Sequence, residues 1–286
     1  MSTPQDSGQE PVGILLHLAG PLQSWGTHSA FNERDTSRFP TRSGIIGLLA
    51  AGMGRQRGEP IKDLARLSLT TRTDRPGVLL RDLHTAGGGL PTKATVTTAE
   101  GKKRPPGKGT LLSHRAYLAD AAFTAVLTCD DAELLHHCAQ ALTRPVWPPY
   151  LGRRACPPET PLLIGVVTNP LHHLIRIPLA RSAPTDARDG TSPRVEFHSD
   201  APLHHLPLAP DAAVPDGHLD GSAPVGEVTD DPVDLSPKRR VYRARPLYRR
   251  TLRLPATPYG GLGADYLTAL QDYLEPLTSR EQGDAA

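Results

Sequence analysis

Between residues 12 and 57 the chain alternates a strand, a turn and a helix, and this segment most strongly limits the possible folds. Val12–Ala19 is largely apolar, which is typical of a strand buried on both faces. Leu22–Gly26 is expected to follow as an exposed turn that carries an aromatic ring, and Arg38–Gly44 as a basic loop. An apolar run from Ile45 to Met53 then predicts a helix over residues 42–57.

The start of this helix is a candidate anion site. The first backbone N–H groups of a helix have no partner within it, and they attract negative charge. Here Arg38, Thr41, Arg42 and Ser43 flank them. A phosphate is the natural anion, because the chain contains neither a metal-binding cluster nor a glycine-rich nucleotide motif. The alternative is that Thr41 or Ser43 caps the helix and that the arginines are solvated.

The other elements of residues 12–180 complete an α+β pattern. Strands are expected at 69–73, 78–84, 123–128 and 162–168, and helices at 60–67 and 130–142. The turn signature Asp74–Gly77 joins the first two of these strands as a pair. Strand, helix, strands, helix and strand is the order of the ferredoxin-like fold with insertions, which RRM-like RNA-binding modules share.

Residues 85–113 interrupt this pattern with little apolar periodicity. Five basic side chains and no acidic one lie between residues 101 and 115: Lys102, Lys103, Arg104, Lys108 and Arg115. Because the segment lies between two predicted strands, we expect a projecting basic β-hairpin with a mobile tip. Its charges suit an RNA backbone, although an exposed loop without function would have the same composition.

The last third of the chain divides into an acidic and a basic part. Arg181–Leu235 has eleven acidic residues against three arginines and contains eight prolines, which predicts a flexible insertion over residues 181–235. Residues 236–276 form a basic, strand-rich C-terminal segment, with a strand over 241–254 and a helix over 262–274. This segregation suggests a surface that faces a polyanion, and an acidic region that repels non-cognate nucleic acid.

Several classes of protein are excluded by the composition. Cys129, Cys138 and Cys156 lack the spacing of a disulfide framework or a zinc site. No apolar run reaches the length of a membrane span, and residues 1–11 lack the pattern of a secretory signal. We therefore expect a cytoplasmic protein without a metal, a cofactor or a membrane partner.

A further candidate site lies at Tyr150–Arg154. Tyr150 can stack on an unpaired base, and the forked guanidiniums of Arg153 and Arg154 can grip phosphates. Trp25 could stack on a base in the same way. Ordinary core packing is the alternative for both aromatic rings.

Three blocks of residues resemble the CasD family. They are Gly20–Gly26 with Phe39–Leu49, then Tyr117–Phe123, and finally Pro149–Pro157 followed by Pro161–Leu162. The resemblance covers about residues 12–165 and is thin from about residue 181 onward.

The resemblance implies a non-catalytic subunit of a type I-E CRISPR surveillance complex (Cascade), with a ferredoxin-like domain of the RAMP superfamily and a role in antiviral defence. Such a subunit caps the 5′ handle of the CRISPR RNA (crRNA), and the basic hairpin would be the thumb of the family. Its partners would be the crRNA, a CasC-type backbone subunit and a CasA-type large subunit, with only indirect contact to target DNA. The candidate RNA-binding residues are Gln23, Ser24, Trp25, Arg38, Thr41, Arg42, Ser43, Lys102, Lys103, Arg104, Lys108, His114, Arg115, Tyr150, Arg153 and Arg154.

Two other functions remain open. Type I-C relatives use this scaffold as a metal-independent endoribonuclease that cuts CRISPR repeat RNA. Cleavage of that kind needs an acid, a base and a group that stabilises charge, and the candidates are His28, His84, His114 and Tyr117, with Lys108 or Arg115 as the stabiliser. The third function is a general chaperone of single-stranded RNA that acts outside a complex.

Overall fold

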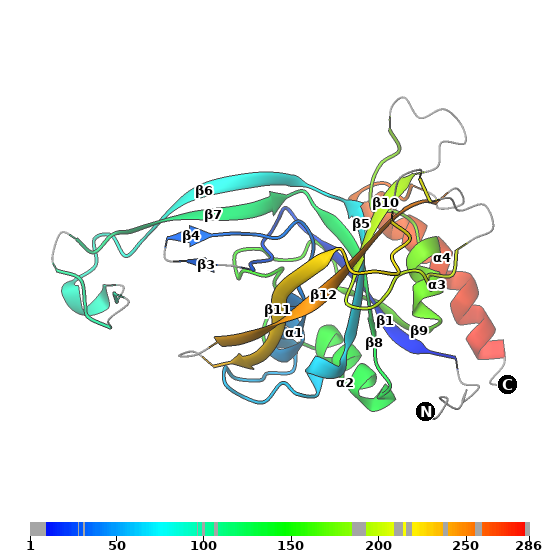
Figure 1. Cartoon of the computed structure of the whole chain (residues 1–286), viewed down its shortest axis with the longest axis horizontal. Coiled ribbons are helices and arrows are strands. Elements are labelled where there is room, and N and C mark those ends of the chain that lie inside the picture. Colours follow the sequence, from blue (N-terminus) through cyan, green and yellow to red (C-terminus); the bar gives the residue numbers. More distant parts are fainter. Residues whose placement is uncertain are drawn as a thin grey trace.

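The computed structural model describes residues 10–283, except 28, 31, 96, 99–100, 106–107, 185–192, 209–213, 216–218, 237–239 and 255–258. The described chain has an α+β fold with a seven-stranded antiparallel sheet at its centre (Figure 1). A second, five-stranded sheet includes a long hairpin that projects away from the body.

Strands make up most of the regular structure, and the helices lie between them along the chain. The strands are β1 (Val12–Ala19), β2 (Leu22–Gln23), β3 (Ser29–Ala30), β4 (Glu33–Arg34), β5 (Ser68–Arg75), β6 (Val78–Ala86), β7 (Leu111–Ala119), β8 (Ala122–Thr128), β9 (Leu163–Thr168), β10 (Arg194–Ser199), β11 (Gly226–Leu235) and β12 (Arg240–Arg253). The helices are α1 (Arg42–Gly52), α2 (Ala132–Thr143), α3 (Pro170–Arg176) and α4 (Gly263–Gly283), with short 3-10 turns η1 (Leu64–Arg66) and η2 (Thr92–Ala94).

The central sheet has the strand order β11-β12-β10-β5-β8-β1-β9, and a hydrophobic layer lies on each of its faces. Side chains of β1 alternate between the two layers. Ile14 and Leu16 pack in the layer that contains α1 and α2, while Leu15 packs with residues of α3 and α4 on the other face. Burial on both faces explains why β1 is apolar along nearly its whole length.

Most of the predicted elements in residues 12–180 are confirmed, but the first helix is shorter than expected. The predicted helix over residues 42–57 ends at Gly52. Gly54 lies in the left-handed region, with φ of 76°, and Val146 packs directly against its backbone. The chain therefore turns away from the helix axis. The helix expected at 60–67 is reduced to the 3-10 turn η1.

The strands expected at 69–73 and 78–84 are both present, but they do not pair with each other. β5 pairs with β8 and β10, whereas β6 pairs with β7 from Val78–Ala119 to Ala86–Leu111. Gly77, with φ of 68°, redirects the chain from one sheet to the other, and a Cβ there would lie 2.7 Å from the carbonyl oxygen of Ala119. The hairpin strands therefore begin at residue 78 and end at 119, and much of the expected 85–113 segment is the loop at the far end.

The prediction of a flexible acidic insertion over residues 181–235 is wrong where that segment forms the strands β10 and β11. β10 lies near the middle of the central sheet, between β12 and β5, and β11 pairs with β12. Val195 and Phe197 of β10 are buried in the core. The short alternation of these two apolar residues was hidden by the surrounding prolines and acids. The predicted C-terminal strand and helix are confirmed as β12 and α4.

The described residues contain neither a membrane-spanning helix nor a metal-binding cluster. None of their helices combines the length and the apolar character that crossing a bilayer requires. The same residues contain no group of three or more histidine, cysteine, aspartate or glutamate side chains placed to hold a metal ion.

Candidate nucleic-acid interface

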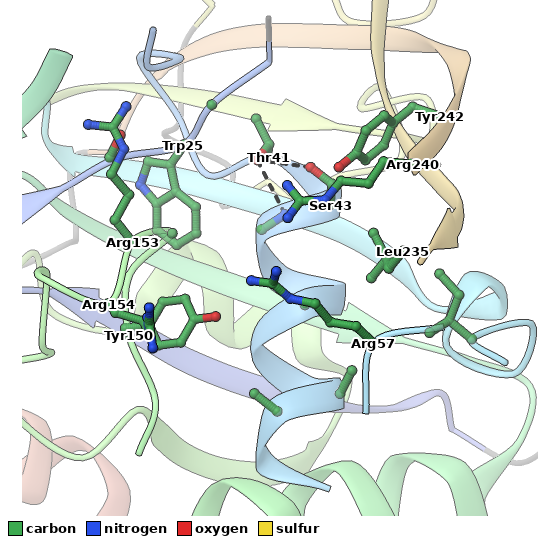
Figure 2. Close-up of a pocket in the computed structure, with 18 of the residues that line it drawn as sticks. Trp25, Thr41, Ser43, Arg57, Tyr150, Arg153, Arg154, Leu235, Arg240 and Tyr242 are labelled. Carbon is green, nitrogen blue, oxygen red and sulfur yellow. Dashed lines mark hydrogen bonds between the residues drawn. The ribbon is translucent and has the colours of Figure 1, made fainter. Parts of the chain in front are cut away.

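A groove of about 1350 Å³ lies over α1, between the loop at residues 147–154 and the β11–β12 hairpin (Figure 2). The face of α1 that forms its floor carries only small residues, namely Ser43, Gly44, Gly47, Ala50 and Ala51. A Cβ atom built on Gly47 would have no neighbour within 4 Å. The helix therefore presents backbone rather than bulky side chains to the groove.

The lining of the groove is strongly basic. Seven arginines line it, namely Arg34, Arg55, Arg57, Arg115, Arg153, Arg154 and Arg240, whereas Glu59 is the one acidic residue among the described lining residues. These arginines come from β4, β7, the segment after α1, the loop at 147–154 and the start of β12. A concave surface of one charge sign concentrates a polyanion.

The arginines differ in whether the protein already satisfies them. Arg57, Arg154 and Arg240 are exposed, and their guanidiniums make no hydrogen bond or ion pair with other described residues. Arg55 instead donates both Nη atoms to Asp63, and this carboxylate raises the pKa of Arg55. The groups left without a partner are the ones available to an anionic ligand.

Arg153 is held in place by the protein. Its Nη atoms donate to the carbonyl oxygens of Ala116, Arg34 and Asp35, each at 3.1 Å. Its guanidinium also lies over the ring of Tyr117, 4.8 Å from the centroid. Arg153 therefore fixes the loop at 147–154 against β7 and β4 while it lines the groove.

Three aromatic side chains reach the groove with part of their surface exposed. Tyr150 lies beside Arg154, Tyr242 lies on the β12 side next to Arg240, and Trp147 is 41% exposed (Figure 2). Such rings beside unpaired guanidiniums can stack on unpaired bases while the arginines contact phosphates. Single-stranded nucleic acid fits this combination.

Gly152 sets the height of the loop that carries Tyr150 and Arg154. It has φ of 83°, and a Cβ there would lie 1.7 Å from the carbonyl oxygen of Ser24. Leu151 accepts a hydrogen bond from the backbone N–H of Ser24 at 3.0 Å. The loop and β2 thus meet backbone to backbone, which only glycine permits.

Gln23, Ser24 and Trp25 do not form the expected exposed turn. All three are buried, and Trp25 is part of the core beneath α1. Its Nε1 donates to Oε1 of Gln23 at 2.9 Å, and Gln23 donates in turn to the carbonyls of Leu18 and Ala121. The interpretation of Trp25 as an exposed stacking platform is wrong, because α1 approaches the ring closely at Gly44 and covers it. The alternative, ordinary core packing, is what the structure has.

The anion at the start of α1 is supplied by the chain itself. The carboxylate of Asp230 accepts the backbone N–H of Arg42 at 2.8 Å, and the hydroxyl of Thr41 accepts that of Gly44. The capping alternative for Thr41 is therefore confirmed.

Arg42 is neither solvated nor in the groove. It is buried, and its guanidinium pairs with Asp200 at 2.6 Å and Asp231 at 3.0 Å and donates to the carbonyls of Leu67 and Ala65. The interpretation of Arg42 as an RNA contact is wrong, because these partners use its donors. Three acids of the 181–235 segment, Asp200, Asp230 and Asp231, thus pair with arginines of this chain.

The other expected residues are divided between the groove and the hairpin. Thr41, Ser43, Arg115, Tyr150, Arg153 and Arg154 line the groove, whereas Arg38 is exposed outside it. Lys102, Lys103, Arg104 and Lys108 belong to the far loop of the β6–β7 hairpin, where Lys103 donates to the carbonyl of Thr95. His114 lies on β7 and pairs with Glu33 at 2.8 Å, a contact that lowers the pKa of Glu33.

Sequence reasoning missed Arg34, Arg57, Trp147, Arg240 and Tyr242 as lining residues. A partial signal existed for Arg240, which belongs to the basic block between residues 237 and 255. Tyr242 lies in the same block, and Trp147 lies three positions before Tyr150. Arg34 and Arg57 come from separate parts of the chain, and only the fold brings them to the groove.

Two of the residues proposed for RNA cleavage, His114 and Tyr117, do not face one another. His114 and Tyr117 lie three positions apart on the regularly paired strand β7, so their side chains point to opposite faces. Tyr117 is buried under Arg153. His84 lies on β6, 3.4 Å from Asp82, and His28 lies outside the described residues.

The chain is similar to CRISPR-associated proteins. The sequence profile described as "CRISPR-associated protein (Cas_Cas5)" matches residues 13–247. Over 159 residues the chain is 38% identical to the "CRISPR system Cascade subunit CasD" of Escherichia coli (strain K12). The match covers 53% of this chain and 70% of that protein.

Two solved structures are similar over most of the fold. A chain of a "CRISPR RNA-guided surveillance complex" matches with a TM-score of 0.75 and 38% identity, covering 92% of this chain and 99% of that one. A "Crystal structure of Cas protein" matches with a TM-score of 0.58 and 30% identity, covering 87% and 98%. The chain belongs to the CasD/Cas5 family of CRISPR-associated proteins.

Proposed function

We propose that this protein is a non-catalytic subunit of a type I-E Cascade that binds and caps the 5′ handle of crRNA in the groove over α1. One observation carries the proposal. Arg57, Arg154 and Arg240 converge on the groove without protein partners among the described residues, beside the partly exposed rings of Tyr150 and Tyr242. A folded RNA end with splayed bases satisfies both kinds of group.

The fold supports a ferredoxin-like RAMP domain as the scaffold. Four strands lie in the order β9-β1-β8-β5, and α1 and α2 connect them on one face. In chain order this is the arrangement expected of the ferredoxin-like fold. The strands β10, β11 and β12 extend the same sheet, and β11 and β12 supply the second wall of the groove.

The β6–β7 hairpin suits the role of a thumb that reaches a CasC-type backbone subunit. It projects from the body, and Val78, Leu79, Leu80 and Leu83 of β6 are all at least 44% exposed. Adjacent exposed apolar residues on an open strand favour contact with another protein. A CasA-type large subunit would contact the complex near the capped handle, and target DNA would be met indirectly, through the guide, in the cytoplasm.

The test is to express the chain with its CRISPR array and neighbouring proteins and to sequence the RNA that co-purifies. A parallel preparation carries Arg154→Ala and Arg240→Ala. The matched control is Arg144→Ala, an exposed arginine at the end of α2 outside the groove. We expect RNA with one shared 5′ handle in the wild-type and control complexes, and loss or fraying of that end in the groove variant.

Two outcomes would contradict the proposal. Mature 5′ ends that appear with this chain and the array alone would make it the nuclease. Random RNA, equally retained by the groove variant, would favour a general chaperone. The separation of His114 from Tyr117 on opposite faces of β7 supports the non-catalytic role against the first outcome.

A further inference from the structure

A second basic pocket, of about 560 Å³, lies on the central sheet over β5, β10 and β12. Arg181, Arg194 and Arg249 line it together with Thr73 and Thr251. Arg194 and Arg249 are exposed, and Arg181 lies over the ring of Tyr259 with 5.4 Å to its centroid. None of the pocket residues lines the groove over α1.

The strand register places these residues on one face of the sheet. Glu196 of β10 lies opposite Thr73 of β5 on one side and Thr251 of β12 on the other. Arg249 is two positions from Thr251, and Arg194 two positions from Glu196, so all five side chains point the same way. The pocket is thus a feature of paired strands rather than of a loop.

The charge of the pocket favours an anion. Arg181 and Arg249 bring two guanidiniums to the pocket beside a single carboxylate, that of Glu196, among the described lining residues. Glu196 lies 3.3 Å from Nε2 of His198, but burial lowers the pKa of His198 to about 4, so this imidazole is neutral at pH 7 and adds no charge. The net positive charge of the pocket is therefore carried by arginines, the residues suited to phosphates.

Two buried polar atoms of the pocket residues are left without partners among the described residues. Oγ1 of Thr73 and Nε of Arg181 make no hydrogen bond. Buried polar groups in folded proteins are rarely unpaired, and such exceptions call for an explanation such as a bound ligand.

β12 fixes the separation between this pocket and the groove. Arg240 lines the groove and Arg249 lines the second pocket, nine positions further along the same strand. At about 3.3 Å per residue this is roughly 30 Å. One nucleotide cannot occupy both places, so a ligand of the second pocket is a different segment or a different molecule.

We infer that the pocket formed by Arg181, Arg194 and Arg249 binds the phosphodiester backbone of nucleic acid at a second site, separate from the groove. The guanidiniums of Arg181 and Arg249 contact phosphates, and Glu196 and the two threonines accept or share hydrogen bonds with sugar hydroxyls or bases. A distal part of the guide RNA and a DNA duplex both offer this backbone. The binding is independent of sequence, because the pocket offers charges rather than a base-shaped slot.

The test measures fluorescence anisotropy of the full chain with three probes: a handle RNA, a longer single-stranded RNA and a DNA duplex of about two helical turns. The variant is Arg181→Gln with Arg249→Gln, and Arg249→Lys is the charge-conserving comparison. Arg144→Gln is the control, and Arg57→Gln with Arg240→Gln reports on the groove. Thermal unfolding of each variant checks that the fold is intact.

We expect the pocket variant to bind the duplex or the longer RNA roughly tenfold more weakly, with the salt slope reduced by about two, one per lost phosphate contact. Which probe is affected tells guide RNA from DNA. The handle RNA should be affected only by the groove variant, so failure of the proposed function and failure of this inference give different results.

Two results would overturn the inference. One is unchanged affinity and salt slope for all three probes in the pocket variant. The other is that polyglutamate binds the wild type but not the variant, while nucleic-acid binding stays the same. That outcome would assign the pocket to an acidic protein segment.

Discussion

Arginines in two regions of this molecule have opposite environments. Arg72 is completely buried, pairs with the equally buried Asp74 and donates to three backbone carbonyls. Arg154 and Arg240 are exposed in the groove and have no partner among the described residues. The contrast teaches that a basic residue indicates a ligand only where the fold leaves its donors unused.

The largest expected effect comes from breaking the buried pair. Arg72→Ala leaves the charge of Asp74 buried without its partner, and we expect a loss of about 3–5 kcal/mol in the free energy of unfolding. Urea unfolding followed by circular dichroism measures it. The double variant Arg72→Met with Asp74→Leu should lose less than Arg72→Ala, because it removes both charges. A single variant as stable as the wild type would show that the pair is dispensable.

The next effect tests the buried contacts of Arg42. Arg42→Ala should cost about 2–4 kcal/mol, because it removes the partner of Asp200 and Asp231 and leaves the carbonyl of Leu67 unpaired. It should also weaken binding of handle RNA, since these contacts hold β11 and β12 against α1. Unfolding and anisotropy on the same preparations test both. An effect on RNA affinity alone would instead place Arg42 in contact with the ligand.

A smaller effect depends on pH and concerns buried groups that are kept neutral. Burial lowers the pKa of both His17 and His198 to about 4, below the unfolded value of 6.5. The contribution of the neutral histidines to the free energy of unfolding is complete above pH 6.5. It is lost as pH falls from 6.5 to about 4. At about pH 5 the loss is about 2 kcal/mol for each histidine. The free energy of unfolding, measured at neutral pH and at about pH 5, should differ less between the two pH values in His198→Gln than in the wild type. An equal difference in both proteins would contradict the prediction.

The smallest effect on stability belongs to the groove. Arg154→Ala or Arg240→Ala should change the free energy of unfolding by no more than about 0.5 kcal/mol. Each should nevertheless weaken handle RNA binding by roughly tenfold and lower the salt slope by about one. Anisotropy titrations at several salt concentrations measure both quantities. Equal losses in Arg144→Ala would mean that general charge, not the groove, binds the RNA.

The apolar pattern predicted the central elements because it extends over their full length. β1 and β8 are buried along nearly all of their residues, α2 buries one apolar face, and their positions follow from that pattern. β10 could not be predicted in the same way, since its buried core is only Val195 and Phe197 within an acidic, proline-rich segment. Pairing with β5 and β12 stabilises it, and this long-range contact leaves no local trace in the sequence.

The site was predicted only in part, for a physical reason that the arginines illustrate. The loop with Arg153 and Arg154 was found from residue types in sequence. Arg42 and Arg240 could not be told apart, because burial depends on whether Asp200 and Asp231 arrive from elsewhere in the chain. Charge is a local property of the sequence, and its neutralisation is a property of the fold.

The contact at Gly152 means that the groove has a fixed width. The loop meets Ser24 through backbone atoms alone, with no side chain between them. Substitution of a neighbouring side chain therefore cannot change the distance between the loop and Ser24. Substitution of Tyr150 or Arg154 changes which groups face the ligand, but the backbone contact at Gly152 sets the spacing of these positions from the sheet. The ligand preference of the groove can therefore change only through its lining side chains, while its width stays constant.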